Sequence, residues 1–427
     1  MSNVVSIVFF GVLMLSLIVF VHELGHFSLA RLFGVRVTEF MIGLPGPNLG
    51  FTAKGTRFGI TPFLLGGYAK IAGMEGGREN PNLARALAWM SEQGTASLEQ
   101  VQDAEHELGF NLEEALDILD IWGSIKRVRK GWSHYHYETI AAGDSAAGQP
   151  RPLADPAAVL DAERQLTYRA LPWWKRVVIL AGGVLYNLVF AVIVITAILM
   201  FIGTEIPTTT FASIVDDSPA AEAGIVAGDS VVELDGVAIT SWEQFSTALS
   251  AMQPGDEVRL VVDHDGTRRS VDVQLADNEG RPMLGVVVQT EHQGTSFVSA
   301  FTTSVGYIGL VAQFIVQLFN PNTFSEVVSQ STSVIGISVE AKNAASAGFL
   351  PFIFLAAALS ISVGLMNLLP LPPLDGGKIV VETIERLTGR IVPVKVVNGI
   401  TVAAMAALLL LFVYVTNQDI HRYFLGG

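Results

Sequence analysis

Two histidines and a glutamate near the amino terminus have the spacing of a metal-dependent hydrolase. They stand in the stretch His22-Glu23-Leu24-Gly25-His26. On an α-helix, residues four positions apart project from one face, so His22 and His26 can offer imidazole nitrogens to one metal ion while Glu23 stands beside it. Zinc accepts such ligands and keeps a position open for water, whose proton an adjacent carboxylate can take. The pattern is short, and two helix-terminal histidines without a metal are the alternative.

The position of this stretch strengthens the metal hypothesis. An almost wholly apolar run, residues 4–20, precedes it, and we expect the helix to continue to about residue 33. Roughly 20 apolar residues cross a bilayer core, so the histidines would lie near one membrane face. Ionisable groups are costly to place there, which indicates that they have a function. Basic residues follow the run and none precedes it: Arg31, Arg36, Lys54, Arg57 and Lys70. The positive-inside rule then predicts an external amino terminus and histidines near the cytoplasm.

The composition indicates a membrane protein that carries soluble parts. Half of the residues are hydrophobic, only 15% are charged, and the mean hydropathy is +0.47. The chain has no cysteine, which excludes disulfides and zinc–cysteine sites. Its net charge of -14 argues against nucleic acid as a partner. The amino terminus lacks the basic region and cleavage site of a secretory signal, so we expect the first apolar run to be retained.

The patterns predict a polytopic α-helical membrane protein with about four transmembrane helices, a membrane-associated β-hairpin and one α+β domain. The expected segments are a first transmembrane helix with the zinc motif (1–40), the hairpin (43–74), a helical cytoplasmic insert (75–160), a second transmembrane helix (173–203), the α+β domain (207–291), an interfacial amphipathic helix and loop (297–345), a third transmembrane helix (349–378) and a fourth (392–416).

The hairpin and the insert differ in kind. Residues 51–54 and 57–62 flank the turn residues at 55 and 56, which favours a hairpin, although an exposed loop fits the pattern about equally well. In the insert, residues 80–89, 98–108 and 112–128 have helical spacing and many carboxylates. His134 and His136 alternate with tyrosines, and we interpret them as a surface strand rather than a second metal site.

The second span begins at the aromatic and basic anchor Trp173-Trp174-Lys175-Arg176. Gly182 and Gly183 within it permit close helix approach. Asn187 follows one turn later, and two roles remain open for it. Its amide could hold neighbouring helices together, or it could donate to a developing oxyanion.

The α+β domain has alternating strand patterns, and Ser241 is the expected cap of a helix that runs to about residue 252. The run from Ser218 to Asp229, followed by a strand and the turn Asp235-Gly236, resembles a PDZ domain of the bacterial protease type. One such module fits the length.

Two histidines leave zinc short of a protein ligand, and Asp375 is the best remaining candidate. It lies in a proline-rich stretch, 367–377, at the end of the third span, where a carboxylate has little structural reason to be. The alternative is that Asp375 only caps the helix that begins near Gly376.

Together these motifs resemble the site-2 protease family of intramembrane zinc metalloproteases, in its bacterial PDZ-bearing branch. The resemblance rests on the histidine motif, Leu374-Asp375-Gly376, the stretch Gly66-Gly67-Tyr68, the Gly182 to Asn187 element and the PDZ domain, and it covers nearly the whole chain except the insert. The family usually carries Gly-Pro where this chain has Gly182-Gly183, which puts the local helix bend in doubt.

The resemblance implies Zn²⁺ held by His22, His26 and Asp375, with Glu23 as general base and acid. Asn187 could stabilise the intermediate, and Gly66, Gly67, Tyr68 and Asn367 could bind substrate. If residues 297–319 crossed the bilayer, Asp375 would finish on the face opposite the histidines, so we expect that segment to lie on the outer surface or to re-enter without crossing.

The implied activity is regulated intramembrane proteolysis in the inner (plasma) membrane of a bacterium. The substrates would be transmembrane segments of single-pass proteins, of the anti-sigma factor or signal-peptide-remnant type, already cut by an upstream extracytoplasmic protease. Membrane lipids would surround the spans. The PDZ domain would lie outside and filter by size or bind new C-termini. A catalytically silent membrane PDZ scaffold and a zinc-handling membrane protein are the alternatives.

Overall fold

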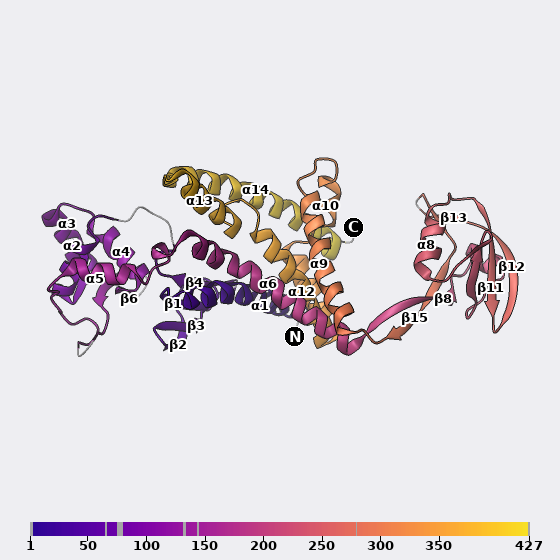
Figure 1. The fold of residues 1–427 in the computed structure, drawn as a ribbon, viewed down its shortest axis with the longest axis horizontal. Helices are drawn as coiled ribbons and strands as arrows, with labels where there is room; N and C mark the ends of the chain where they lie inside the picture. The colour runs from indigo at the N-terminus through magenta and orange to yellow at the C-terminus, as the bar shows by residue number, and fades with distance from the viewer. Residues whose placement is uncertain are drawn as a thin grey trace. The chain divides into compact units, whose positions relative to one another are not determined.

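The computed structural model describes residues 3–64, 66–74, 80–130, 134–142, 145–278 and 280–425. The expected insert begins among residues 75–79, which lie outside this range. The chain divides into two compact units. Met1–Ile195 with Thr302–Gly427 form the main unit, and Thr196–Phe301 form the second unit (Figure 1).

Five helices of the described chain are long and apolar enough to cross a membrane, one more than the sequence predicts. They comprise α1 (Asn3–Leu32), α6 (Trp173–Ile202), α9 (Phe297–Gln317), α12 (Phe349–Asn367) and a helix of residues Lys395–Tyr423, which takes in most of α14 (Val394–Ile420) and the start of η2 (His421–Leu425). Shorter helices accompany them: α10 (Phe324–Gln330), α11 (Val334–Ala347) and α13 (Asp375–Thr388). Figure 1 shows α9 lying across the direction of α1 rather than along it.

Small residues let three of these helices pack closely. A Cβ atom added at Gly11 of α1 would lie 2.1 Å from the Ser338 hydroxyl of α11. Met14 and Ile18 of α1 are buried against Ala341 of α11 and Ala356 of α12. Close backbone approach through small residues is the usual way in which helices associate in lipid.

The expected hairpin is part of a larger, four-stranded sheet with the strand order β2-β3-β1-β4. Its strands are β1 (Val37–Ile42), β2 (Leu49–Ala53), β3 (Thr56–Ile60) and β4 (Gly67–Ile71). Lys54 and Gly55 join β2 to β3 and both have positive φ, 49° and 79°, as a tight two-residue hairpin turn requires. β1 pairs with β3 in parallel and with β4 antiparallel. The sequence predicts a hairpin or a loop here and does not predict these two pairings.

The insert, predicted as helical with a strand at His134 and His136, is an α+β lobe in which that strand, β7, belongs to a three-stranded sheet. Its helices are α2 (Leu83–Gln93), α3 (Leu98–Leu108), α4 (Leu112–Trp122) and α5 (Pro156–Arg164), and its sheet has the order β5-β7-β6, formed by Thr95–Ser97, His134–Thr139 and Ile125–Lys130. The expected helix 112–128 stops at Trp122 because Gly123 takes the left-handed conformation that ends helices. A 3₁₀ turn, Tyr168–Ala170, leads on to α6.

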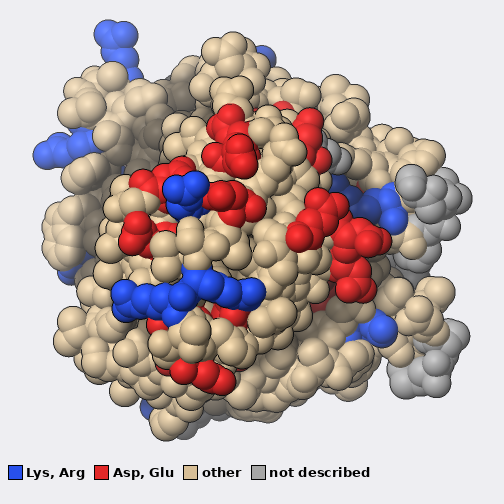
Figure 2. Space-filling model, turned by 90° about the vertical axis from the view of Figure 1, so that its right-hand side faces the viewer, with Lys and Arg blue, Asp and Glu red and all other residues tan. Residues whose placement is uncertain are grey.

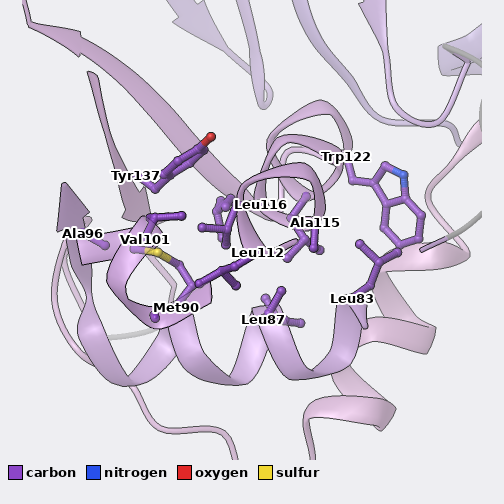
Figure 3. Close-up of a cluster of buried hydrophobic side chains, with 14 of the residues drawn as sticks. Leu83, Leu87, Met90, Ala96, Val101, Leu112, Ala115, Leu116, Trp122 and Tyr137 are labelled. Carbon is purple, nitrogen blue, oxygen red and sulfur yellow. The ribbon is translucent and has the colours of Figure 1, made fainter. Parts of the chain in front are cut away.

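One hydrophobic core holds this insert lobe together (Figure 3). Leu83, Met90, Leu112 and Leu116 from α2 and α4 face Tyr137 of β7, and these side chains are fully or almost fully buried. The hydroxyl of Tyr137 donates to Asp117 across 2.6 Å. A core of this kind indicates that the insert is a folded element rather than a linker.

The second unit contains a six-stranded sheet. Five of its strands follow the order β12-β11-β9-β8-β15, and β10 pairs with β9. The strands are β8 (Thr204–Ile214), β9 (Ser230–Leu234), β10 (Val237–Ala238), β11 (Glu257–His264), β12 (Thr267–Gln274) and β15 (Val286–Gln293), with the small hairpin β13 (Ala276–Asn278) and β14 (Arg281–Met283) and the helices α7 (Pro219–Glu222) and α8 (Trp242–Ser250).

The first and last strands of this unit are partners. Thr204 of β8 pairs with Gln293 of β15, so the chain enters and leaves the unit at neighbouring points. Phe211, Phe245 and Leu260 are fully buried in its core. Acidic side chains are spread over the face shown in Figure 2, with fewer basic ones among them.

Candidate active site

Three ligand atoms from two distant parts of the chain converge in the main unit. The Oδ2 atom of Asp375 lies 3.1 Å from Nε2 of His22 and 3.1 Å from Nε2 of His26, and the two nitrogens are 3.2 Å apart. All three residues are buried, between 4% and 8% exposed. The structure thus brings together residues that are 349 positions apart.

The triangle of donor atoms fits a zinc ion. Zinc binds imidazole nitrogen and carboxylate oxygen at roughly 2.0–2.2 Å in tetrahedral geometry, and neighbouring ligand atoms are then about 3.3 Å apart. The observed separations of 3.1–3.2 Å are close to this value. Three protein donors leave a fourth position for water or substrate, as in catalytic zinc sites.

The helix α6 supplies a partner for the second nitrogen of each histidine. Nδ1 of His26 lies 2.8 Å from the Ile179 carbonyl oxygen, which is an acceptor. Nδ1 of His22 lies 3.4 Å from the Asn187 amide. A histidine held through Nδ1 keeps Nε2 directed at the metal. No sequence signal marks the Ile179 carbonyl, because any residue type provides one.

Glycines on α1 and α6 make this contact possible. A Cβ atom at Gly25 would lie 2.1 Å from the Gly182 carbonyl oxygen, and one at Gly183 would lie 2.5 Å from the His22 ring and 2.6 Å from that of His26. The Gly182-Gly183 pair therefore leaves room for the imidazoles, whether or not the helix bends at this point.

Asp375 is held by a tight loop rather than by the end of a span. The helix α12 ends at Asn367, and Asp375 is the first residue of α13, whose N-cap is Leu374. The expected third span, 349–378, therefore consists of α12, the proline-rich stretch and the first turn of α13. A Cβ atom at Gly376 would lie 2.2 Å from the Leu368 carbonyl oxygen, so the loop folds back closely on the first turn of α13. The side chain of Asp375 contacts the histidines, which contradicts the helix-cap alternative.

Glu23 lies between the histidines and the sheet. Its Oε2 atom accepts a hydrogen bond from the Ala69 backbone N–H at 3.0 Å. A Cβ atom at Gly67 would lie 3.8 Å from Cγ of Glu23, so β4 runs beside this carboxylate. β4 is an edge strand, and the Ala69 N–H reaches Glu23 instead of pairing within the sheet.

The other predicted substrate-binding residues form hydrogen bonds with groups outside the triangle of His22, His26 and Asp375. Gly66 has a φ of 109°, and its carbonyl accepts from the Gly43 N–H. The hydroxyl of Tyr68 donates to Glu39 at 2.7 Å. The side-chain amide of Asn367 donates to the Val363 carbonyl of its own helix at 2.9 Å.

The strand interpretation of His134 and His136, rather than a second metal site, agrees with the structure, where both lie on β7. Nε2 of His136 lies 4.0 Å from Oε2 of Glu138 on the same strand. Among the residues that the structure describes, the cluster of three metal-ligand side chains is the one formed by His22, His26 and Asp375.

Comparisons with known proteins agree with this geometry. Residues 10–411 match the model of peptidase family M50. The zinc metalloprotease RasP of Shouchella clausii is 26% identical over 432 residues, which cover 96% of this chain and 97% of that protein. A protein of Enterococcus faecalis named probable protease eep is 25% identical over 439 residues, which cover 98% of each chain.

Two solved PDZ domains match part of the chain. One, from an SdrC-like protein of Listeria monocytogenes, is 30% identical, and the match covers 19% of this chain and 87% of that chain with a TM-score of 0.18. The other, from Listeria innocua, is 26% identical, and the match covers 21% and 99% with a TM-score of 0.19. From the family match along nearly the whole chain, we conclude that this protein belongs to peptidase family M50, the site-2 proteases, and is a membrane-embedded zinc metalloprotease.

Proposed function

We propose that this protease hydrolyses peptide bonds in the membrane-embedded segments of other proteins, with His22, His26 and Asp375 as the zinc ligands and Glu23 as the general base and acid. The observation that supports this most strongly is the triangle of ligand atoms with sides of 3.1–3.2 Å. It lies on a helix long enough to span a bilayer.

The residues divide the chemistry as follows. Zinc, when bound, supplies Lewis acidity that makes a nearby water nucleophilic at neutral pH and polarises the scissile carbonyl. Glu23 takes the proton of the attacking water and later gives it to the leaving amine. The burial of the three ligands limits competing solvent around the reacting groups.

A substrate helix hides its peptide bonds in its own hydrogen bonds, so it must be held extended near Glu23. The outer edge of β4 supports strand addition at this place. The Ala69 N–H on this edge points toward Glu23, so an added strand would lie beside the catalytic carboxylate. Gly67 and Tyr68, two of the substrate-binding residues that the resemblance implies, lie on β4.

The decisive experiment compares Glu23→Gln with Asp375→Ala in purified protein. Glu23→Gln should abolish cleavage of a membrane substrate and retain zinc, whereas Asp375→Ala should lose both. Glu39→Gln is the matched control, since this carboxylate lies on the neighbouring strand β1 and accepts from Tyr68. Cleavage by Glu23→Gln would refute the mechanism, and metal traffic retained in that variant would favour a zinc-handling protein.

We further propose the orientation predicted from the charges: a bacterial inner membrane, an external amino terminus, a zinc site near the cytoplasmic face, an external PDZ unit and α9 on the outer surface. The crosswise direction of α9 in Figure 1 supports this. The chain has no cysteine, so single cysteines at Gly294 and Asn322 can flank α9 without background. Both should react with an impermeant external reagent, whereas a spanning α9 would protect one.

The proposed substrates are single-pass membrane proteins, such as anti-sigma factors or signal-peptide remnants, already trimmed by an outer protease. Membrane fragments that persist in cells carrying Glu23→Gln, and disappear with the active enzyme, would identify them. Fragments that persist equally in both strains would contradict this substrate class.

We propose that the PDZ unit binds the new C-termini of trimmed substrates. β15 ends the sheet with a free edge, and Leu284-Gly285 lead into it. Strand addition beside such a loop suits a terminal carboxylate. Peptides with a free carboxylate should bind more tightly than amidated ones in fluorescence anisotropy, whereas equal or absent binding would favour a size filter.

A further inference from the structure

The carboxyl end of α4, in the insert lobe, contacts the active-site sheet through an ion pair. Nζ of Lys70 on β4 lies 2.7 Å from Oδ2 of Asp120. Both side chains are largely buried, 24% and 16% exposed, so water screens this pair less than a surface pair. The other oxygen of Asp120 accepts from the Arg127 N–H at 2.8 Å, which fixes the carboxylate.

A second anchor lies where α1 passes into β1. The guanidinium of Arg36 donates to both carboxylate oxygens of Glu163, at 2.5 and 3.3 Å. It also donates to the carbonyls of Trp122 and Gly123, at 3.1 Å each. A bidentate pair combined with a cation at a helix carboxyl end is a strong and directional arrangement. The hydroxyl of Ser124 completes it by donating to Glu163 at 2.8 Å.

The surfaces also fit closely at this point. Gly123 has a φ of 72°, and a Cβ atom there would lie 2.6 Å from Cγ2 of Thr38 on β1. The hydroxyl of Thr38 donates in turn to the Lys70 carbonyl at 3.2 Å. The end of α4 therefore contacts both β1 and β4. The contact at Gly123 leaves no room for a side chain.

Lys70 directly follows Ala69, the residue whose N–H contacts Glu23. β4 has a sheet partner on one side only, so it lacks the second row of hydrogen bonds that fixes an inner strand. A brace on Lys70 would supply part of that missing constraint. It would act one residue away from the contact with the catalytic carboxylate.

We propose that the insert lobe is a brace for β4, and that Lys70 and Asp120 are positioning residues for the edge that holds Glu23 and the substrate strand. This rests on the proposed function, since it deepens the roles of Glu23 and β4. The lobe acts through the sheet and makes no contribution to the zinc ligands.

The test is a charge-swap series in the full-length enzyme. Lys70→Glu and Asp120→Lys are measured singly and together for kcat and KM on a membrane substrate, with zinc content and thermal stability in parallel. Arg259→Asp with Asp272→Arg is the matched control, because that pair is exposed, lies 2.7 Å apart and belongs to the second unit.

We expect each single change to lower kcat/KM by about tenfold to a hundredfold, as misplacement of catalytic geometry by about 1 Å does. Zinc content should stay at one ion per chain, and the double swap should recover most of the activity. The control pair should leave kcat/KM unchanged.

Three results would overturn the brace. The singles could have wild-type kcat/KM, the swap could fail to restore impaired singles, or the singles could lose zinc together with activity. Glu23→Gln in the same series keeps the two proposals apart. If Glu23→Gln is inactive while Lys70→Glu is normal, the brace alone fails, whereas an active Glu23→Gln refutes the proposed function first.

Discussion

The Ala69 N–H donates to Oε2 of Glu23 across 3.0 Å, and this bond joins the metal-site helix to the edge of the sheet. The same N–H is the group that a substrate strand would use if it paired with β4. In that proposal, substrate binding and the position of the Glu23 carboxylate would be coupled through one backbone N–H group.

Replacing Ala69 with proline should impair proteolysis without unfolding the sheet. Proline removes the N–H, and an edge strand tolerates this where the N–H faces away from its partner. We expect kcat/KM to fall at least tenfold while zinc content is unchanged, measured by cleavage assay and metal analysis. Ala69→Gly keeps the donor and is the control. Normal cleavage by Ala69→Pro would show that neither Glu23 nor the substrate needs this group.

Asn187 is expected to act through His22. An imidazole that binds zinc through Nε2 carries its proton on Nδ1, so it needs an acceptor there. The Asn187 Oδ1 atom is buried with no hydrogen-bond partner among the described residues, and rotation of the amide would direct it to His22.

Asn187→Ala should therefore weaken zinc binding by roughly 10–100-fold, whereas Asn187→Asp, which keeps an acceptor, should retain most of it. Competition with a chelator of known affinity measures both. Unchanged zinc affinity with a reduced kcat would instead favour the oxyanion role that the sequence left open.

Gly183→Ala should abolish zinc binding or strongly weaken it. The added methyl group would lie 2.5 Å from the His22 ring, and overpacking of this kind typically costs about 1–3 kcal/mol. Gly399→Ala is the matched control. Gly399 lies on α14, another long apolar helix, and a Cβ atom added there has no described heavy atom within 4 Å. Metal content near wild type in Gly183→Ala would mean that the helices separate at little cost.

Acid should destabilise the second unit through Asp229. Burial alone would raise the pKa of this carboxyl, but hydrogen bonds from the Val226 N–H at 3.0 Å, from Arg269 at 2.5 Å and from His264 at 2.8 Å hold its pKa below the ordinary value of 3.8. A lowered pKa stabilises the fold above the pKa of the unfolded carboxyl, and this stabilisation disappears as the pH falls through the folded value.

The fragment Thr196–Phe301 has its own core, so its thermal unfolding can be measured at pH 7 and through the range below about pH 4. Asp229→Asn should lower stability at pH 7 by about 1.5–3 kcal/mol and flatten the loss in acid. An unchanged acid profile in this variant would assign the titration to another group.

Part of the active site could be predicted because its signals are local. The spacing of His22 and His26 is a helical period, and Asp375 stands among prolines and glycines that otherwise have little reason to follow a span. The cap at Ser241 is equally local, and its hydroxyl accepts from the Gln244 N–H.

Other features depend on contacts between distant residues, which leave no mark in the sequence nearby. Gly34, with a φ of 81°, ends α1, but residues 37–42 carry no local strand signal, and they form a strand because β3 and β4 pair with them. The backbone groups of Ile179 and Ala69 have no side-chain signature. The predicted helix 112–128 takes in most of the basic run 126–130. Gly123 ends α4 before this run, and pairing with β7 makes the run a strand.

Ile179, Gly183 and Asn187 follow one another at intervals of four residues, so the carbonyl, the gap and the amide form one stripe along α6. Successive residues of a helix differ by about 100° around its axis. A rotation of α6 by one residue would withdraw all three from the histidines at once. The metal centre therefore fixes the angular setting of the second helix, and zinc occupancy would report a twist of that helix.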